Sequence, residues 1–134
     1  MKKNIIVLIL VILFAFGCLG PTIEKPVEEG IKCNDLDCII KNFSECKKAF
    51  GTTIEEEEEA FIQILEPFGE KCEVYFRLEK SSKLPEILFG LDAKCKLSLN
   101  ELIELQETMN IEELDCEGPL YEVAINAKNL GLIQ

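Results

Sequence analysis

The chain has 134 residues, no histidine and no tryptophan, and its 25 acidic residues outnumber its 14 basic ones, which gives a net charge of −11. This length predicts one globular domain. An acidic surface repels phosphate groups, so nucleic acids and anionic lipid headgroups are excluded as partners of that surface. The lack of histidine removes the commonest general base, and no G-x-S-x-G, P-loop or G-x-G-x-x-G motif occurs. The composition therefore predicts neither an enzyme nor a bound cofactor.

The first 17 residues differ in composition from the rest. Lys2 and Lys3 form a positive head, and residues 5–16 are an unbroken apolar run of twelve. A positive head, a short apolar middle and a small residue at its end are the parts of a secretory signal peptide. A permanent membrane-spanning helix needs roughly 20 apolar residues. We therefore predict that residues 1–17 are a signal peptide, with an uncleaved N-terminal transmembrane anchor as the alternative.

The junction that follows, Gly17-Cys18, resembles the lipobox of prokaryotic (archaeal or bacterial) membrane lipoproteins, in which a signal peptide is cut just before a cysteine that is then lipidated. Gly17 and Cys18 match its last two positions, whereas Ala15 and Phe16 differ from the residues that the family prefers. The resemblance implies that Cys18 carries a lipid and holds the protein on the outward face of the cell membrane. Residues 15–17 also satisfy the small-x-small rule of ordinary cleavage, so a secreted chain is a further alternative.

The next segment carries two prolines, two glycines and mixed charge with no hydrophobic period. We interpret residues 18–32 as the lipid-attachment cysteine and a flexible linker, and residues 33–134 as the extracytoplasmic domain. Apolar residues recur at helical spacing over residues 34–50. Asn34 suits the N-cap and Gly51 the end, so one helix is predicted there.

Three strands are predicted after this helix. Residues 52–66 are interpreted as extended, with apolar residues on both faces, and residues 71–80 and 86–97 alternate between apolar and polar side chains. Short turns separate the three segments. Because consecutive strands usually lie side by side, the simplest topology is a three-stranded antiparallel meander.

Two helices are predicted in the C-terminal part. Ser98 and Glu101 have the spacing of a capping box and open a helix over residues 99–107. Pro119 suits the first position of a last helix that runs to Leu130. The predicted fold is therefore α+β: an N-terminal signal or anchor helix, then one helix, a three-stranded meander and two C-terminal helices.

The cysteine count is odd. Apart from Cys18, the chain has six, all within the predicted domain: Cys33, Cys38, Cys46, Cys72, Cys95 and Cys116. An even set in an exported chain predicts three disulfides, and the seventh cysteine is explained by a lipid. The paired C-x2-C spacing that is typical of structural zinc sites and of thiol exchange does not occur.

The pairing of these six cysteines stays open, since six cysteines allow fifteen arrangements. Cys46 falls on the apolar face of the first predicted helix, which directs it toward the sheet. It is therefore expected to pair with Cys72 or Cys95, unless those two pair with each other. Cys38 lies on the opposite face of the helix, so the first or the last cysteine of the set is its expected partner.

Two weaker site candidates remain. Glu55, Glu57 and Glu59 alternate in an acidic run and would point the same way in a strand, where they could collect a calcium ion with waters. The simpler interpretation is a solvated edge strand whose charge prevents pairing with another chain. Asn42 begins an N-x-S glycosylation sequon inside the first predicted helix. We favour chance occurrence there.

The sequence thus favours a surface-anchored lipoprotein whose small disulfide-bonded domain binds a protein or a cell-wall component without turnover. Its contact with the membrane would be made by the lipid or by an N-terminal helix. Two alternatives stay open: an accessory or solute-binding subunit of a membrane complex, and a small extracellular hydrolase that uses carboxylates alone. The domain itself resembles no family of known function.

Overall fold

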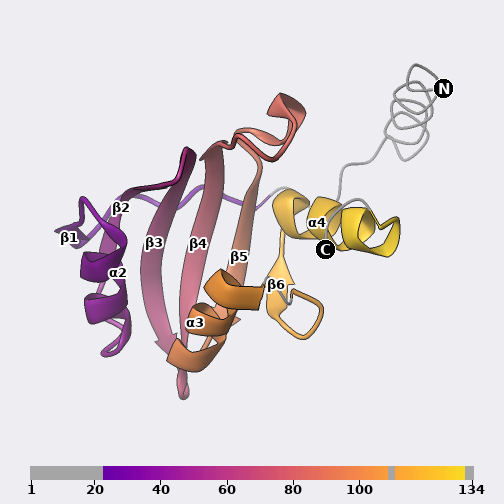
Figure 1. Cartoon of the computed structure of the whole chain (residues 1–134). Helices are drawn as coiled ribbons and strands as arrows, with labels where there is room; N and C mark the ends of the chain where they lie inside the picture. The colour runs from indigo at the N-terminus through magenta and orange to yellow at the C-terminus, as the bar shows by residue number, and fades with distance from the viewer. Residues whose placement is uncertain (1–22, 109–110, 132–134) are drawn as a thin grey trace, which may run out of the picture.

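The computed structural model describes residues 23–108 and 111–131, which are built around one six-stranded sheet (Figure 1). The strand order β1-β2-β3-β4-β5-β6 follows the chain. β1 pairs with β2 in parallel, and the other neighbouring pairs are antiparallel. The strands are β1 (Ile31–Lys32), β2 (Ala49–Glu55), β3 (Glu58–Phe68), β4 (Lys71–Lys80), β5 (Asp92–Leu97) and β6 (Asp115–Glu117).

Three α-helices accompany the sheet in these residues: α2 (Leu36–Phe43), α3 (Leu99–Thr108) and α4 (Pro119–Asn129). Figure 1 shows α2 and α3 in front of the sheet, whereas α4 lies beside β5 and β6. The predicted signal or anchor helix falls within residues 1–22, outside the described residues. The architecture is α+β.

The core lies between the front face of the sheet and the helices. One row of cross-strand partners runs across five strands: Ala49, Ile64, Val74, Cys95 and Cys116. The first four are buried, as alternation along a strand requires of one face. The helices complete this core with Ile39, Phe43 and Leu102.

The predicted capping box is confirmed. The Ser98 backbone N–H donates to Glu101 Oε2 at 2.7 Å, and the Glu101 N–H donates to Ser98 Oγ at 3.2 Å. The Glu101 carboxylate also pairs with Lys71 Nζ at 2.9 Å, which ties α3 to the start of β4. α4 begins at Pro119 as predicted.

The prediction of a three-stranded meander is wrong, because the sheet is mixed and has six strands. The first cause is the predicted helix over residues 34–50. The real helix begins after Asp35, whose Oδ1 accepts from the Cys38 N–H at 2.8 Å, and not after Asn34. It ends at Phe43, and Cys46 then adopts a left-handed conformation with φ +49° that turns the chain into β2.

The second cause is the glutamate run, which is a hairpin and not a single strand. Glu55 and Glu58 are cross-strand partners, so Glu56 and Glu57 form a two-residue loop between β2 and β3. Their φ angles are +45° and +73°, as in a type I′ turn. Such turns favour Asn-Gly, so two glutamates give no indication of one.

The third cause is the C-terminal half. Residues 86–97 contain a short 3₁₀ helix, η1 (Glu86–Leu88), and only then β5. Ile87, which lies within the predicted strand, is exposed. β1 and β6 have two and three residues, too few for a hydrophobic period, and β1 lies within the predicted linker.

The prediction of three disulfides is confirmed. Two of the bonds fall within the pairings expected for Cys38 and Cys46. The third joins two cross-strand partners of β5 and β6. The bonds are Cys33–Cys38, Cys46–Cys72 and Cys95–Cys116.

Candidate functional site

Residues 23–30, which we name the N-terminal strap, cross the back face of the sheet from the side of α4 to β1 (Figure 1). At one end, Ile23 packs close to Gly118, where a Cβ would come within 3.1 Å of Ile23 Cδ1. At the other end, Gly30 has φ +106°, and a Cβ there would lie 2.1 Å from Lys48 O. Only glycine fits this close approach, so Gly30 fixes where the strap joins the sheet.

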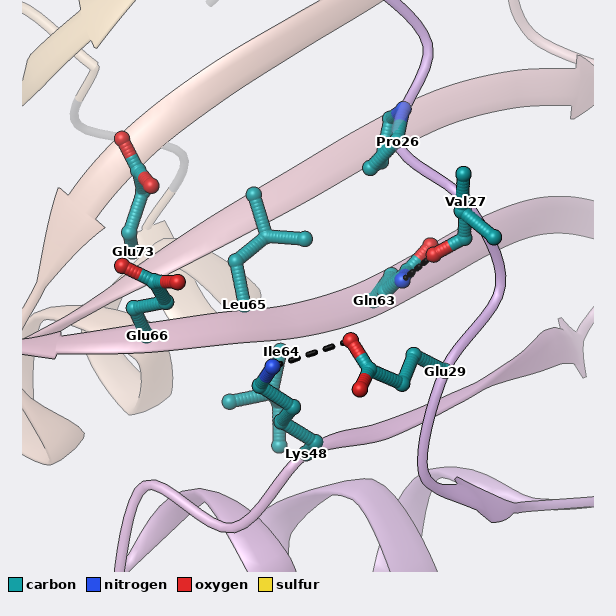
Figure 2. Close-up of a pocket in the computed structure, with 9 residues that line it drawn as sticks. All are labelled: Pro26, Val27, Glu29, Lys48, Gln63, Ile64, Leu65, Glu66 and Glu73. Atoms are coloured by element: carbon teal, nitrogen blue, oxygen red, sulfur yellow. Dashed lines mark hydrogen bonds and ion pairs between the residues drawn. The ribbon is translucent and has the colours of Figure 1, made fainter.

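A pocket of about 290 Å³ lies between the strap and β3. Figure 2 shows the strap residues Val27 and Glu29 along one side, and Lys48, from the turn before β2, facing Glu29. The Glu29 and Lys48 side chains form an ion pair at 2.9 Å. The strap therefore supplies a wall of the pocket as well as the connection to residues 1–22.

A β-bulge shapes the sheet side of the pocket. Ile64 pairs with Val74, but the next pair is Pro67 with Cys72, so β3 has one residue more than β4 over this interval. The residues between, Leu65 and Glu66, line the pocket. Bulges bend a strand and redirect its side chains, and they are frequent next to functional sites.

Gln63 is the most unusual lining residue. Its side chain is only 1% exposed, and its Nε2 donates to Val27 O at 2.7 Å. Its Oε1 is buried, and no hydrogen-bond partner for it occurs among the described residues. An unsatisfied buried acceptor costs about 1–3 kcal/mol. Gln63 Oε1 is therefore a buried acceptor that lacks a donor among the described residues.

The pocket is acidic. Glu29, Glu66 and Glu73 line it together with Lys48. The hydrogen bond that Lys48 donates to Glu29 raises the pKa of Lys48 above its usual value, and Glu66 adds a smaller Coulombic contribution. Lys48 is thus a permanent cation that Glu29 already neutralises. The remaining charge belongs to Glu66 and Glu73.

The back face beside the pocket is a packed aromatic layer. The Tyr75 ring meets the Phe61 ring edge-on with centroids 6.1 Å apart, and the Arg77 guanidinium lies 4.8 Å from the Phe61 centroid. Burial raises the pKa of Tyr75 to about 12, and its hydrogen bond to Asp92 at 2.8 Å adds to this. Tyr75 therefore stays neutral at physiological pH.

The structure places the weaker candidates from the sequence away from this pocket. Glu55, Glu57 and Glu59 lie at the β2–β3 hairpin, and no group of three or more Cys, Asp or Glu side chains in the described ranges is arranged to hold a metal ion. Asn42 is buried, and its Nδ2 donates to Cys38 O at 2.8 Å. Cys18 lies outside the described residues.

Sequence reasoning missed the pocket, although one indication was present. Gln63 is the only polar residue in the run from Phe61 to Leu65. A polar side chain in an apolar run that is buried from both sides needs a partner. The partner is the backbone of the strap, which no local pattern could identify.

The comparisons identify no relative. No protein-family model, curated protein or solved structure matches the chain. Within residues 23–108 and 111–131, none of the helices has the length and apolar character needed to cross a membrane.

Proposed function

We propose that this protein is a membrane-anchored surface lipoprotein whose α+β domain is a binding module and whose ligand-binding site is the pocket beneath the strap. The lipid on Cys18 would hold the domain at the outward face of the cell membrane. The domain would act by presenting the pocket to a protein or a cell-wall component, without turnover.

The anchoring part of the proposal is supported by the cysteines. Three disulfides use six of the seven, which leaves Cys18 alone at the end of an apolar leader. Disulfides form and persist outside the reducing cytosol. A lone cysteine in an exported chain needs another fate, and a thioether to a lipid supplies one.

The binding part rests on one observation, the buried Gln63 Oε1 in the pocket, which has no partner among the described residues. A protein interior seldom leaves such an atom unsatisfied. Binding pockets typically combine apolar walls with a few directed polar groups. The pocket has this composition, since Leu65 and Pro26 line it together with Gln63 and three glutamates.

The strap shortens the tether. Only five residue steps separate Cys18 from Ile23, which already packs against the domain beside Gly118. Five steps span at most about 18 Å when fully extended. A lipid on Cys18 would therefore hold the edge of the sheet that carries α4 close to the bilayer.

Intact mass of the protein from the membrane fraction of its host tests the anchor. The expected mass is that of a chain beginning at Cys18 with an added lipid, and reduction of its three disulfides should add six hydrogens. A Cys18→Ala variant is the matched control and should lose the lipid. A mass that includes Met1 would show that the leader is not cleaved. It would refute the lipoprotein proposal in favour of an N-terminal membrane anchor.

A further inference from the structure

We propose that the pocket beneath the strap binds an alkylammonium or alkylguanidinium group, such as the end of a lysine or arginine side chain or of a small free amine. This inference rests on the proposed function, because it names the ligand class of that same site. Three features of the pocket carry it: a buried acceptor, two carboxylates that form no ion pair among the described residues, and an apolar stretch between strap and sheet.

The acceptor selects a ligand that donates hydrogen bonds. Gln63 Nε2 is committed to Val27 O at 2.7 Å, which fixes the orientation of the amide and leaves Oε1 as the free acceptor. An anionic ligand such as a carboxylate or phosphate has only acceptors to offer it. An N–H group in the amide part of the ligand would supply the donor at this end of the pocket.

The charge selects a cation. Glu29 is neutralised by Lys48, whereas no ion pair within 4 Å joins Glu66 or Glu73 to a cation in the described part of the chain. In Figure 2 both carboxylates lie at the end of the pocket opposite Val27. Glu66 is exposed and Glu73, the cross-strand partner of Lys96, is half-buried, so the two carboxylates attract a cation at an open end of the pocket.

The apolar stretch and the size select an aliphatic chain. Leu65 projects between Gln63 and Glu66 in Figure 2, and the strap contributes Pro26, whereas Val27 is 85% exposed and meets Gln63 through its backbone carbonyl. Lysine and arginine side chains lay their methylene groups along such surfaces and keep the charged end in a polar place. A volume of about 290 Å³ suits one side chain or one small molecule, and is at the lower end for ligand pockets.

The test is titration calorimetry on the full chain in detergent micelles with four probes of similar size. These are the Nα-acetyl methylamides of lysine, arginine, norleucine and glutamate. Norleucine keeps the aliphatic chain of lysine without its charge. Cadaverine and agmatine, the free amines, form a second arm that separates a small-molecule source from a side-chain source.

The lysine and arginine probes are expected to bind, and the norleucine and glutamate probes to bind at least about tenfold more weakly. A Glu66→Gln/Glu73→Gln variant should weaken the cationic probes about three- to tenfold, with little change for norleucine. Glu70→Gln is the matched control, because Glu70 is exposed in the β3–β4 turn and does not line the pocket. Gln63→Met, checked by its melting curve, should weaken both cationic probes.

Three outcomes would overturn the inference: equal affinity for lysine and norleucine, unchanged lysine affinity in the double variant, or no heat from any cationic probe at millimolar concentration. If norleucine or glutamate binds with a dependence on Gln63, the pocket remains a binding site and only the cationic ligand class is lost. The lipid on Cys18, measured by mass, is independent of all these results.

Discussion

Replacing Glu57 by glycine is expected to stabilise the protein, although it shortens a side chain and adds backbone freedom. Glu57 occupies the second position of the β2–β3 turn with φ +73°. A left-handed conformation costs a residue with a Cβ about 1–2 kcal/mol, and glycine loses about 0.5–1 kcal/mol more backbone entropy on folding. The difference predicts a gain of about 0.5–1 kcal/mol in the free energy of unfolding, or about 3–6 °C in the melting temperature.

Glu55→Gly is the matched control for this change. Glu55 lies two residues earlier in β2, is also exposed, and does not have a positive φ. Both variants remove one carboxylate from the same acidic run, so the relief of charge repulsion is similar. Glu55→Gly should lower the free energy of unfolding by about 0.5–1 kcal/mol, because only the entropy term remains. Urea unfolding of both variants decides the matter, and shifts of the same sign would refute the reasoning from turn geometry.

Three further outcomes are expected. The bond between Cys46 and Cys72 spans 26 residues, so replacing both cysteines by alanine should lower the free energy of unfolding by about 3.5 kcal/mol, measured with denaturant. The Cys33–Cys38 bond spans only five residues. A smaller loss for the Cys46–Cys72 pair than for the Cys33–Cys38 pair would contradict the loop-entropy argument. The hydrogen bond from the Ser98 N–H lowers the pKa of Glu101 below its ordinary 4.5, so the stabilisation from this carboxylate is present above pH 4.5 and is lost as the pH falls through the lower folded pKa. Glu101→Gln should therefore flatten the acid limb of the curve of stability against pH. Ser98→Ala should lower the free energy of unfolding by about 1 kcal/mol. Gly30→Ala should speed hydrogen exchange at β1, because the added Cβ would meet the Lys48 backbone in the turn before β2. Unchanged exchange would place the strap further from the sheet than described.

The parts of the fold that the sequence predicts correctly are those with local physical causes. The capping box of Ser98 and Glu101 needs only two side chains three residues apart, and Pro119 needs only a free helix end. The strand over residues 71–80 follows from strict alternation and is found as β4 with the same bounds. The signal for each of these features lies within its own segment.

The parts that sequence reasoning missed depend on contacts between distant segments. The first helix stops at Phe43 because Cys46 takes a left-handed turn, and the Cys46–Cys72 bond ties that turn to β4. The apolar period itself continues through Phe50, so it cannot mark the end of the helix. Likewise β1 exists because Gly30 allows the backbone to approach β2, which is a matter of tertiary packing and not of composition.

The strap makes the anchor and the pocket one system. In the proposed arrangement the lipid is attached at Cys18, five steps from Ile23, and the segment that follows contributes the Val27 carbonyl that orients Gln63. It also contributes the Glu29 carboxylate that neutralises Lys48. Ligand binding in the pocket and docking of the strap would therefore stabilise one another, because the strap residues that line the pocket are also those that contact the sheet. A displaced strap would separate Glu29 from Lys48, leave a positive charge in the pocket and remove the constraint on the Gln63 amide. In the proposed arrangement the site therefore accepts a cation only while the strap lies against the sheet.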